Sequence, residues 1–465
     1  MVFSSGIFLF LFLPIVLLIY YNPLIRSRSF RNIFLFLASI IFYAWGEPVY
    51  VLLMLSSIVV NWLFGRCIMA GKNSTVIAAL AVVYNLAFLF VFKYLDFAIT
   101  NCNNLLNLSI PLFGIELPIG ISFYTFQAMS YVIDVKRKPE LAQRSLLNVG
   151  LYIACFPQLI AGPIVRYETV AQQIRERTES WNDVTVGLRR FLWGLAKKVI
   201  LANNLAKFAD LAFDGTELST ALAWLGAAAY MLQIYFDFSG YSDMAIGLGQ
   251  LFGFEFPENF RYPYAARSVS DFWRRWHMTL SSFFRDYVYI PLGGNRKRWA
   301  VNMLLVWLLT GLWHGASWNF VLWGLYYFVF LMLEKIYLEK RLETLPKAVQ
   351  HIYTMLVVLF GWVFFYFEDL SAIKAFFISA FGGHGFLNLT QSTVCVNYIA
   401  VLLVGAVLSC PILPYLKTVA HRLSAKRLGR ASLNTACLLF AVGALAVATA
   451  ALVGTSYNPF LYFRF

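Results

Sequence analysis

Five histidines occur in this chain of 465 residues, and His314 has the surroundings that best suit catalysis. It lies in the stretch Leu-Leu-Thr-Gly-Leu-Trp-His-Gly-Ala-Ser-Trp-Asn-Phe, where one hydrophobic run ends and the next begins. A neutral imidazole can accept a proton from a hydroxyl group and return it near neutral pH. Gly311 and Gly315 flank the histidine and would let a substrate approach the backbone. A packed histidine that bonds a carbonyl between two helices explains the same pattern equally well.

A second histidine, His277, lies in a stretch rich in aromatic residues and arginines, just before another hydrophobic run. One interpretation is a vestibule in which the guanidinium groups of Arg274, Arg275 and Arg285 hold the phosphates of a donor molecule. The other interpretation is an interfacial helix whose arginines contact lipid headgroups. The local pattern slightly favours the interfacial helix.

The other polar residues are weaker candidates. Asp237 and Asp243 lie in an apolar segment, but they are six positions apart and do not share one face of a helix. We therefore expect them to accept hydrogen bonds from Arg, Tyr or Ser rather than to act as a catalytic pair. The cysteines are scattered without a disulfide or zinc-binding pattern, so no metal site is expected. His351, His384 and His421 are expected to be ordinary surface residues.

The composition indicates that membrane helices carry these residues. Hydrophobic residues make up 60% of the chain, charged residues make up only 13%, and the mean hydropathy is +0.68. Soluble domains carry about 25% charged residues, so this composition excludes a soluble enzyme. The abundance of apolar side chains excludes a disordered chain, and the long apolar runs exclude an outer-membrane barrel. The predicted fold class is all-α, with multiple transmembrane passes.

The net charge of +14 is interpreted as the positive-inside bias of cytoplasmic loops, which contact anionic lipid headgroups. The chain carries no nucleic-acid-binding motif, so no nucleic-acid partner is expected. Arg26, Arg28 and Arg31 indicate that the loop after the first helix lies inside and the N-terminus lies outside. The later basic loops fit the same orientation.

A helix needs about 20 apolar residues to span a membrane. The clear candidates are 7–21, 33–45, 49–64, 76–92, 299–313, 318–333, 353–367, 394–409 and 436–453. The segments 112–135, 146–162 and 221–254 are interrupted by Pro, Gly or Asp, and such helices survive at membrane depth only inside protein or beside a wet cavity. We expect about eleven or twelve membrane segments in one domain over 1–465, with the site in the interrupted middle.

Four stretches resemble the membrane-bound O-acyltransferase (MBOAT) family, namely Phe156-Pro-Gln-Leu-Ile-Ala-Gly-Pro-Ile-Val-Arg166 and the segments around Asp237, His277 and His314. Within that family, the chain is similar to the bacterial branch that contains the alginate O-acetyltransferase membrane component. The recognisable core covers 1–340, and 341–465 has the character of generic transmembrane helices. The resemblance implies a bowl-like helical fold with a central tunnel. It also implies that His314 is the catalytic histidine and that His277 is a second polar residue lining the tunnel.

The function that this resemblance implies is O-acetylation of an extracytoplasmic polysaccharide such as alginate. The acetyl group would come from a cytoplasmic thioester, most simply acetyl-CoA, with His314 as general base and His277 in the same catalytic site. No bound cofactor is expected, because the thioester is a co-substrate. The residues assigned to the donor are Arg274, Arg275, Arg285, Trp313, Trp318 and Asn319, of which the tryptophans would keep water from the ester. The mechanism requires a passage that reaches the His314 ring from both faces of the membrane.

The expected location is the cytoplasmic (inner) membrane of a bacterium. Besides membrane lipid and the acyl donor, the expected partners are periplasmic acetyltransferase proteins and a complex that synthesises or exports an exopolysaccharide. A partner is expected because we find no large extracytoplasmic domain to hold a polymer. D-alanyl or other acyl transfer to a cell-wall polymer stays open within the family. A polymer or lipid transporter, which broken helices with acidic residues would suit, and a scaffold for an export complex stay open outside it.

Overall fold

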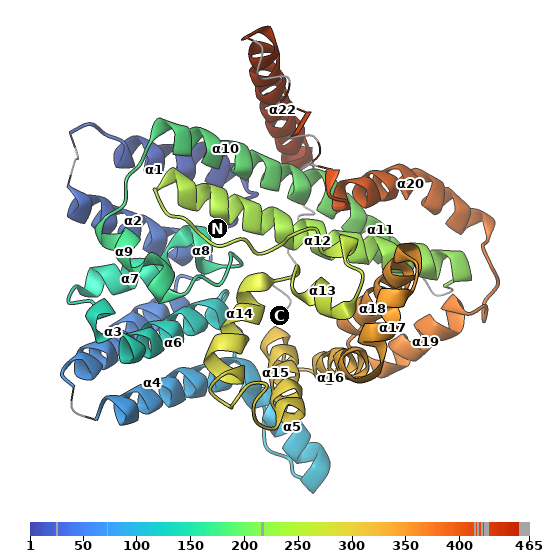
Figure 1. Cartoon of the computed structure of the whole chain (residues 1–465), viewed down its shortest axis with the longest axis horizontal. Helices are drawn as coiled ribbons and strands as arrows, with labels where there is room; N and C mark the ends of the chain where they lie inside the picture. The colour runs from blue at the N-terminus through green and yellow to red at the C-terminus, as the bar shows by residue number, and fades with distance from the viewer. Residues whose placement is uncertain are drawn as a thin grey trace. The chain divides into compact units, whose positions relative to one another are not determined.

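In the computed structural model, the described residues are 1–24, 27–71, 73–214, 218–412, 415, 418–419, 422 and 427–454, with the backbone alone for 427–434. Arg26 and His421 therefore lie outside the described residues. Every regular element in these ranges is a helix, as Figure 1 shows. The prediction of an all-α chain is confirmed.

Among the described residues, six helices are long and apolar enough to cross a membrane, namely Tyr50–Met69, Ser74–Leu106, Trp318–Thr344, Lys347–Tyr366, Leu389–Ser409 and Thr435–Gly454. Three shorter apolar helices are Phe8–Tyr20, Trp299–His314 and Leu370–Ala380. At a rise of about 1.5 Å per residue, only the longer group covers the hydrocarbon core without help from neighbours. The prediction of a multi-pass membrane protein is confirmed. The predicted total of about eleven or twelve membrane segments also counted shorter and interrupted segments.

The chain divides into two compact units. Unit 1 comprises Met1–Phe191 and Ser242–Pro257, and unit 2 comprises Leu192–Tyr241 and Glu258–Phe465. Two long helices, α10 (Trp181–Ala196) and α12 (Thr220–Leu251), contribute residues to both units. Every residue predicted for the catalytic or donor site lies in unit 2. A single domain over 1–465 stays a prediction.

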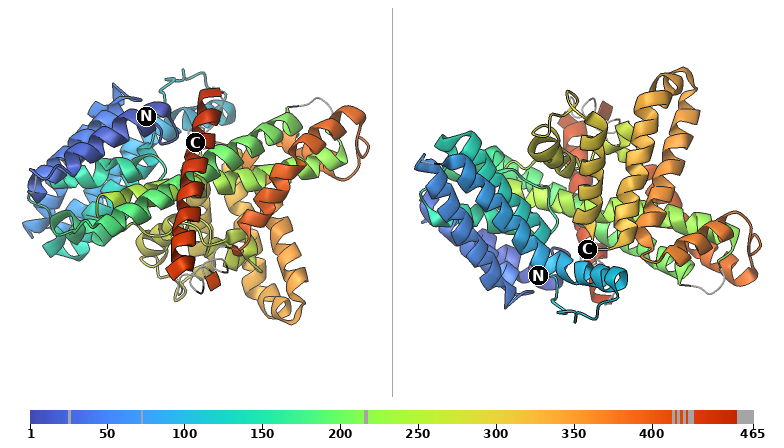
Figure 2. Two further views of the ribbon diagram at one scale, coloured as in Figure 1. Left: turned by 90° about the horizontal axis from the view of Figure 1, so that it is seen from above. Right: turned by 90° about the horizontal axis from the view of Figure 1, so that it is seen from below.

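Unit 1 is organised around α6 (Ile121–Arg137), which is buried along almost its whole length. Helices α3 (Tyr50–Met69) and α4 (Ser74–Leu89) pack against α6, and α2 (Arg28–Ala44) packs against α7 (Leu146–Ala154). Figure 2 shows these blue and teal helices lying side by side in two further views. The remaining elements of this unit are η1 (Phe8–Phe12), α1 (Leu13–Tyr20), η2 (Phe90–Tyr94), α5 (Leu95–Leu106), η3 (Pro139–Leu141), α8 (Phe156–Leu159) and α9 (Tyr167–Arg175).

Unit 2 is organised around the antiparallel pair α15 (Trp299–His314) and α16 (Trp318–Leu333). Helix α18 (Lys347–Tyr366) packs against α16, and the short α13 (Val269–Trp273) packs against both α16 and α18. The other elements are η4 (Lys197–Ala202), α11 (Asn203–Phe213), η5 (Pro263–Ala265), α14 (Met278–Phe284), η6 (Arg285–Tyr289), η7 (Glu334–Leu338), α17 (Glu339–Thr344), α19 (Leu370–Ala380), α20 (Leu389–Ser409) and α22 (Arg427–Gly454).

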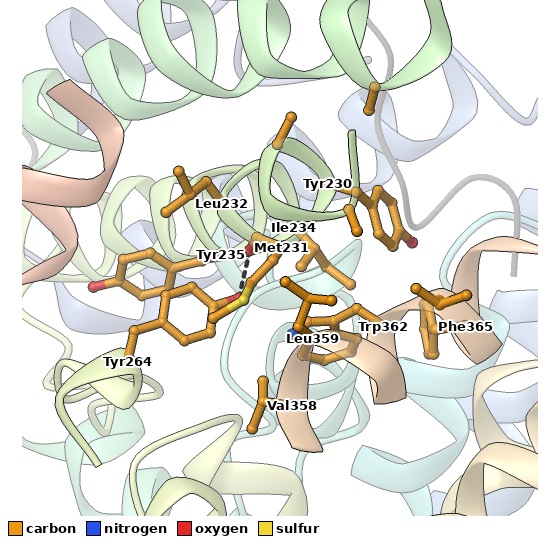
Figure 3. Close-up of a cluster of buried hydrophobic side chains, with 14 of the residues drawn as sticks. Tyr230, Met231, Leu232, Ile234, Tyr235, Tyr264, Val358, Leu359, Trp362 and Phe365 are labelled. Carbon is orange, nitrogen blue, oxygen red and sulfur yellow. Dashed lines mark hydrogen bonds between the residues drawn. The ribbon is translucent and has the colours of Figure 1, made fainter. Parts of the chain in front are cut away.

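Large aromatic side chains fill the core of unit 2. Trp323, Tyr327 and Trp362 are almost completely buried in it. Figure 3 shows another part of this core, where the Tyr264 hydroxyl donates a hydrogen bond to the backbone carbonyl of Met231. Burial of such large rings supplies much of the packing energy and leaves little free volume around the elements that it holds.

Two glycines let α15 and α16 touch through their backbones. A Cβ atom on Gly311 would lie 2.3 Å from the Phe320 carbonyl oxygen, and one on Gly324 would lie 2.4 Å from the Trp307 carbonyl oxygen. Small residues commonly mediate such close packing between membrane helices. Because α15 ends at His314, this contact helps to set the position of that histidine.

Helix α12 contains the two aspartates of the apolar segment, and each pairs with a cation. Asp243 accepts hydrogen bonds from Arg190 at 3.0 and 3.1 Å, so its predicted partner type is confirmed. Asp237 lies 2.7 Å from the Lys198 ammonium group, and both side chains are only 2% exposed. Lys198 also donates to the Asn203 side chain at 3.0 Å. The prediction for Asp237 named Arg, Tyr or Ser and did not name a lysine.

We predict that Gly324→Ala lowers the free energy of unfolding by about 1–3 kcal/mol, because the added methyl group must push α15 and α16 apart. Thermal unfolding of the purified full chain in detergent measures this change. Gly443→Ala in α22 is the matched control, because the space beside Gly443 is open and alanine is the better helix former. Equal losses in the two variants would contradict the packing argument.

We also predict that Lys198→Met costs about 3–5 kcal/mol, because it leaves the buried Asp237 carboxylate without its cation. The double variant Lys198→Met/Asp237→Leu should recover most of this loss, since no buried charge remains. The same unfolding measurement reports both variants. A wild-type midpoint for Lys198→Met alone would show that the ion pair contributes nothing to stability.

Candidate active site

His314 is the last residue of α15, and aromatic rings surround its imidazole. The side chain is buried, and its ring centroid lies 5.0 Å from Trp313, 5.1 Å from Trp323 and 5.2 Å from Phe365, each in an edge-on arrangement. Such packing fixes the plane of the imidazole and keeps bulk water away from it. The hairpin between α15 and α16 therefore holds one ionisable group in apolar surroundings.

The two glycines beside His314 have a packing role. A Cβ atom on Gly315 would lie 2.2 Å from the ring of Phe320, and one on Gly311 would meet the carbonyl oxygen of the same residue. Phe320 occupies the space beside both glycines, so the prediction that a substrate approaches the backbone there is wrong.

His277 lies between α13 and α14, and its backbone is left-handed, with φ 42° and ψ 51°. Its side chain is buried, and its ring packs against Phe238 at 4.7 Å and Trp313 at 5.8 Å. Trp313 therefore contacts both imidazoles, so the structure brings the two predicted histidines together. Burial lowers the pKa of His277 well below its ordinary value, and the nearby His314 lowers it further.

A buried asparagine that the sequence interpretation did not single out holds His277. Asn259 is completely buried, and its Oδ1 lies 3.0 Å from Nδ1 of His277. The same oxygen accepts hydrogen bonds from the backbone N–H and the hydroxyl of Thr279. The Asn259 carbonyl accepts from the N–H of Met278. No sequence pattern indicates this contact, because the two residues lie 18 positions apart.

A cavity of about 600 Å³ opens beside His277. Its residues come from α13, α14 and α15 and the turns next to them, and its walls are mostly apolar. The lining residues are Ser270, Trp273, Arg274, His277, Met278, Leu280, Ser281, Ser282, Phe284, Arg285, Met303, Val306, Trp307 and Thr310. His314 is not among them, so the predicted passage that reaches its ring from both faces of the membrane stays a prediction.

The three predicted donor-binding arginines differ in their partners. Arg275 lies 2.8 Å from the Asp271 carboxylate and does not line the cavity. Arg285 lines the cavity but makes two hydrogen bonds to Asp286, at 2.6 and 3.1 Å. Arg274 is exposed and lines the cavity, and among the described residues no carboxylate pairs with it. The guanidinium of Arg274 is therefore the one most available to an anionic ligand.

The other residues predicted to bind the donor do not line this cavity. Trp313 lies against the histidines, and Trp318 at the start of α16 is 56% exposed. Asn319 is completely buried, and its amide donates to the Phe364 carbonyl at 3.4 Å. Trp318 and Asn319 belong to the second helix of the hairpin, whereas the first helix lines the cavity.

Glu334 is a second positioning residue that the sequence interpretation missed. This buried carboxylate accepts hydrogen bonds from the backbone N–H groups of Val269 and Ser270, at 2.6 and 2.9 Å, and from the Ser270 hydroxyl at 2.8 Å. It caps the start of α13, the helix that leads to Arg274. In the sequence, Glu334 is the first residue of the charged stretch 334–347, and nothing there indicates that it caps a distant helix.

Taken together, these contacts give an arrangement that can accommodate a ligand with an anionic end and a less polar arm. The cavity is lined by Arg274, whose guanidinium pairs with no carboxylate among the described residues, its walls are mostly apolar, and the buried imidazole of His277 lies at its side. A second imidazole, that of His314, packs against Trp313, which also contacts His277. In the part of the chain that the structure describes, no three His, Cys, Asp or Glu side chains are close enough to hold a metal ion.

Comparisons with known proteins identify relatives of this chain. It is 41% identical over 427 residues to the probable alginate O-acetylase AlgI of Azotobacter vinelandii, covering 88% of this chain and 84% of the relative. It is 33% identical over 519 aligned positions to the peptidoglycan O-acetyltransferase of Helicobacter pylori, covering 100% and 98% of the two chains. It is 26% identical over 272 residues to the teichoic acid D-alanyltransferase of Bacillus subtilis, covering 54% and 68%.

The MBOAT, membrane-bound O-acyltransferase family, matches residues 72–374. This range contains both histidines, the cavity and the capping residues described above. The match covers more than half of the chain, and the long alignments with acetylating relatives agree with it. The chain is thus an integral membrane O-acyltransferase, a member of the MBOAT family.

Proposed function

We propose that this enzyme moves an acetyl group from a cytoplasmic thioester, acetyl-CoA, to hydroxyl groups of an extracytoplasmic polysaccharide such as alginate. One observation carries the proposal: Trp313 contacts both imidazoles beside a cavity that is lined by Arg274, whose guanidinium pairs with no carboxylate among the described residues. The acetylating relatives support the choice of acyl group, because their names specify alginate and peptidoglycan O-acetylation.

In the proposed reaction, His314 is the general base. Its neutral imidazole accepts the proton of the acceptor hydroxyl while the hydroxyl oxygen attacks the thioester carbonyl carbon. The new C–O bond forms, the C–S bond breaks, and the leaving sulfur takes the proton from the imidazole. The buried aromatic surroundings of His314 support this role, because they exclude water that would otherwise hydrolyse the thioester.

The donor is proposed to lie in the cavity beside His277, with its phosphate groups at Arg274. A guanidinium binds phosphate oxygens through two parallel hydrogen bonds, and Arg274 has no competing carboxylate among the described residues. The apolar walls suit an uncharged arm that carries the acetyl group. Arg285 would bind the donor phosphates only if its two hydrogen bonds to Asp286 were broken.

The proposed location is the cytoplasmic membrane of a bacterium, with the donor inside and the acceptor polymer outside. The proposed partners are periplasmic acetyltransferase proteins and an exopolysaccharide synthesis or export complex. Transfer of D-alanine from an aminoacyl carrier protein is the second candidate, because a teichoic acid D-alanyltransferase also aligns with about half of the chain.

We predict that His314→Ala lowers acetyl transfer by about 10²–10⁴-fold, the usual contribution of a general base. Mass analysis of acetyl groups on the exopolysaccharide measures transfer in cells, and thiol release from acetyl-CoA measures it with purified protein. His384→Ala is the matched control, because His384 is exposed and remote in sequence from the site. Full activity of folded His314→Ala would overturn the assignment. Thioester consumption with a D-alanyl carrier but not with acetyl-CoA would favour the second candidate.

We predict that Arg274→Ala raises the KM for acetyl-CoA by about tenfold or more, because it removes a charge-assisted hydrogen bond of about 1.5–3 kcal/mol. The KM for acetyl-pantetheine, which has no phosphate, should stay near the wild-type value. Arg275→Ala is the matched control, since that guanidinium already pairs with Asp271. An equal rise in KM for both thioesters, or a larger effect at Arg275, would contradict the assignment of phosphate binding to Arg274.

A further inference from the structure

The contact between Asn259 and His277 determines which ring nitrogen carries the proton. Oδ1 of Asn259 faces the backbone N–H of Thr279 at 3.3 Å, and a backbone N–H can only donate. The side-chain amide is therefore oriented with its oxygen toward Thr279, because the reversed orientation would set two donors against each other. The same oxygen lies 3.0 Å from Nδ1 of His277, so Nδ1 must be the nitrogen that donates.

The second ring nitrogen of His277 has no partner within the described ranges. Nε2 is buried, and among the described residues it makes no hydrogen bond. Buried polar atoms in proteins are usually paired, but several others in the described residues also lack a hydrogen bond. The observation that points to a ligand is therefore the position of His277 on the cavity wall. His277 lines the cavity, and its Nδ1 is occupied by Asn259. Of the two ring nitrogens, only Nε2 is therefore left for a ligand that binds in the cavity.

The backbone at His277 supports a functional role for this arrangement. Its φ of 42° lies in the left-handed region, which few residues with a side chain adopt because it is strained. This conformation lets the N–H of Met278 reach the Asn259 carbonyl while the imidazole reaches Oδ1 of the same residue. Asn259 thus holds both the backbone and the ring, and the ring keeps one orientation.

We propose that Asn259 is a positioning residue that keeps neutral His277 protonated on Nδ1, so that Nε2 faces the cavity as a hydrogen-bond acceptor. The ligand must then bring an N–H or O–H group to Nε2. The thioester carbonyl oxygen only accepts, so it does not meet this requirement, whereas the amide N–H groups of a pantetheine-type arm do. His277 binds the arm of the donor, and His314 moves the proton. This assignment of the ligand rests on the proposed function, but the tautomer does not.

Nitrogen NMR of the full chain, labelled with ¹⁵N-histidine and held in detergent micelles, tests the tautomer without any activity. The chain has only five histidines, and the missing signal in His277→Gln assigns the residue. At neutral pH we expect a protonated Nδ1 and an unprotonated Nε2. A proton on Nε2 in the wild type would overturn the proposal.

Variants at Asn259 separate the positioning role from a structural one. Asn259→Ala should shift the proton of His277 toward Nε2, and Asn259→Asp should keep it on Nδ1, because a carboxylate also accepts from Nδ1. The matched control is Asn302→Ala, since Asn302 is equally buried but donates to the carbonyls of Gly294 and Lys297. It should lower stability and leave the tautomer unchanged. If Asn259→Ala does not fold, the NMR spectra of the wild type and of Asn259→Asp still test the tautomer. An altered tautomer in Asn259→Asp contradicts the proposal.

Kinetics test the ligand. His277→Gln removes the Nε2 acceptor from its fixed position, so we expect a rise of about tenfold in the KM for acetyl-CoA and a smaller change in kcat. A fall in kcat as large as that of His314→Ala, with KM unchanged, would overturn the binding role and favour proton transfer by His277. If acetyl-CoA is not consumed by the wild type at all, the proposed function fails while the NMR result for the tautomer stands.

Discussion

Direct backbone contact between α15 and α16 is the interaction on which the candidate site depends. Gly311 and Gly324 leave no space for a side chain between the two helices, so the last turn of α15 has one position relative to α16. That position holds His314 among Trp313, Trp323 and Phe365. Trp313 extends the same packing to His277, and a hairpin of two helices thereby relates two imidazoles from separate segments of the chain.

Buried polar groups fix the orientation of the segments that pack together. In apolar surroundings, a polar group without a partner is costly, so pairing within the protein is strongly favoured. Glu334 pairs with the start of α13, Asn259 pairs with the segment from His277 to Thr279, and Lys198 pairs with Asp237. These contacts join segments that lie far apart in the sequence. The groups that they leave available, Nε2 of His277 and the guanidinium of Arg274, are the ones that a ligand would use.

Sequence reasoning predicted the helical membrane class, which is confirmed, and singled out two histidines that the structure places around one tryptophan, but it predicted only part of their surroundings. Arg274 and Arg285 line the cavity, whereas Arg275, next to Arg274 in the sequence, turns to Asp271. Arg274 and Arg275 directly follow α13 (Val269–Trp273), and consecutive residues of a helical turn point to different neighbours. Trp318 and Asn319 follow His314 closely in the sequence, yet Gly315 separates them from α15, and they start the opposite helix.

By itself, the sequence determined that this chain is a multi-pass helical membrane protein, because composition and apolar run length depend on local residue content alone. Its motifs also indicated the family and the histidine pair, since these occur in contiguous stretches. Only the tertiary structure decided which arginine has no carboxylate partner among the described residues, which side chain contacts Nδ1 of His277 and where the cavity lies. The tautomer and the cavity depend on contacts between separate segments of the chain, and the pairing of the arginines depends on the direction in which each side chain points. A linear pattern of residues specifies neither.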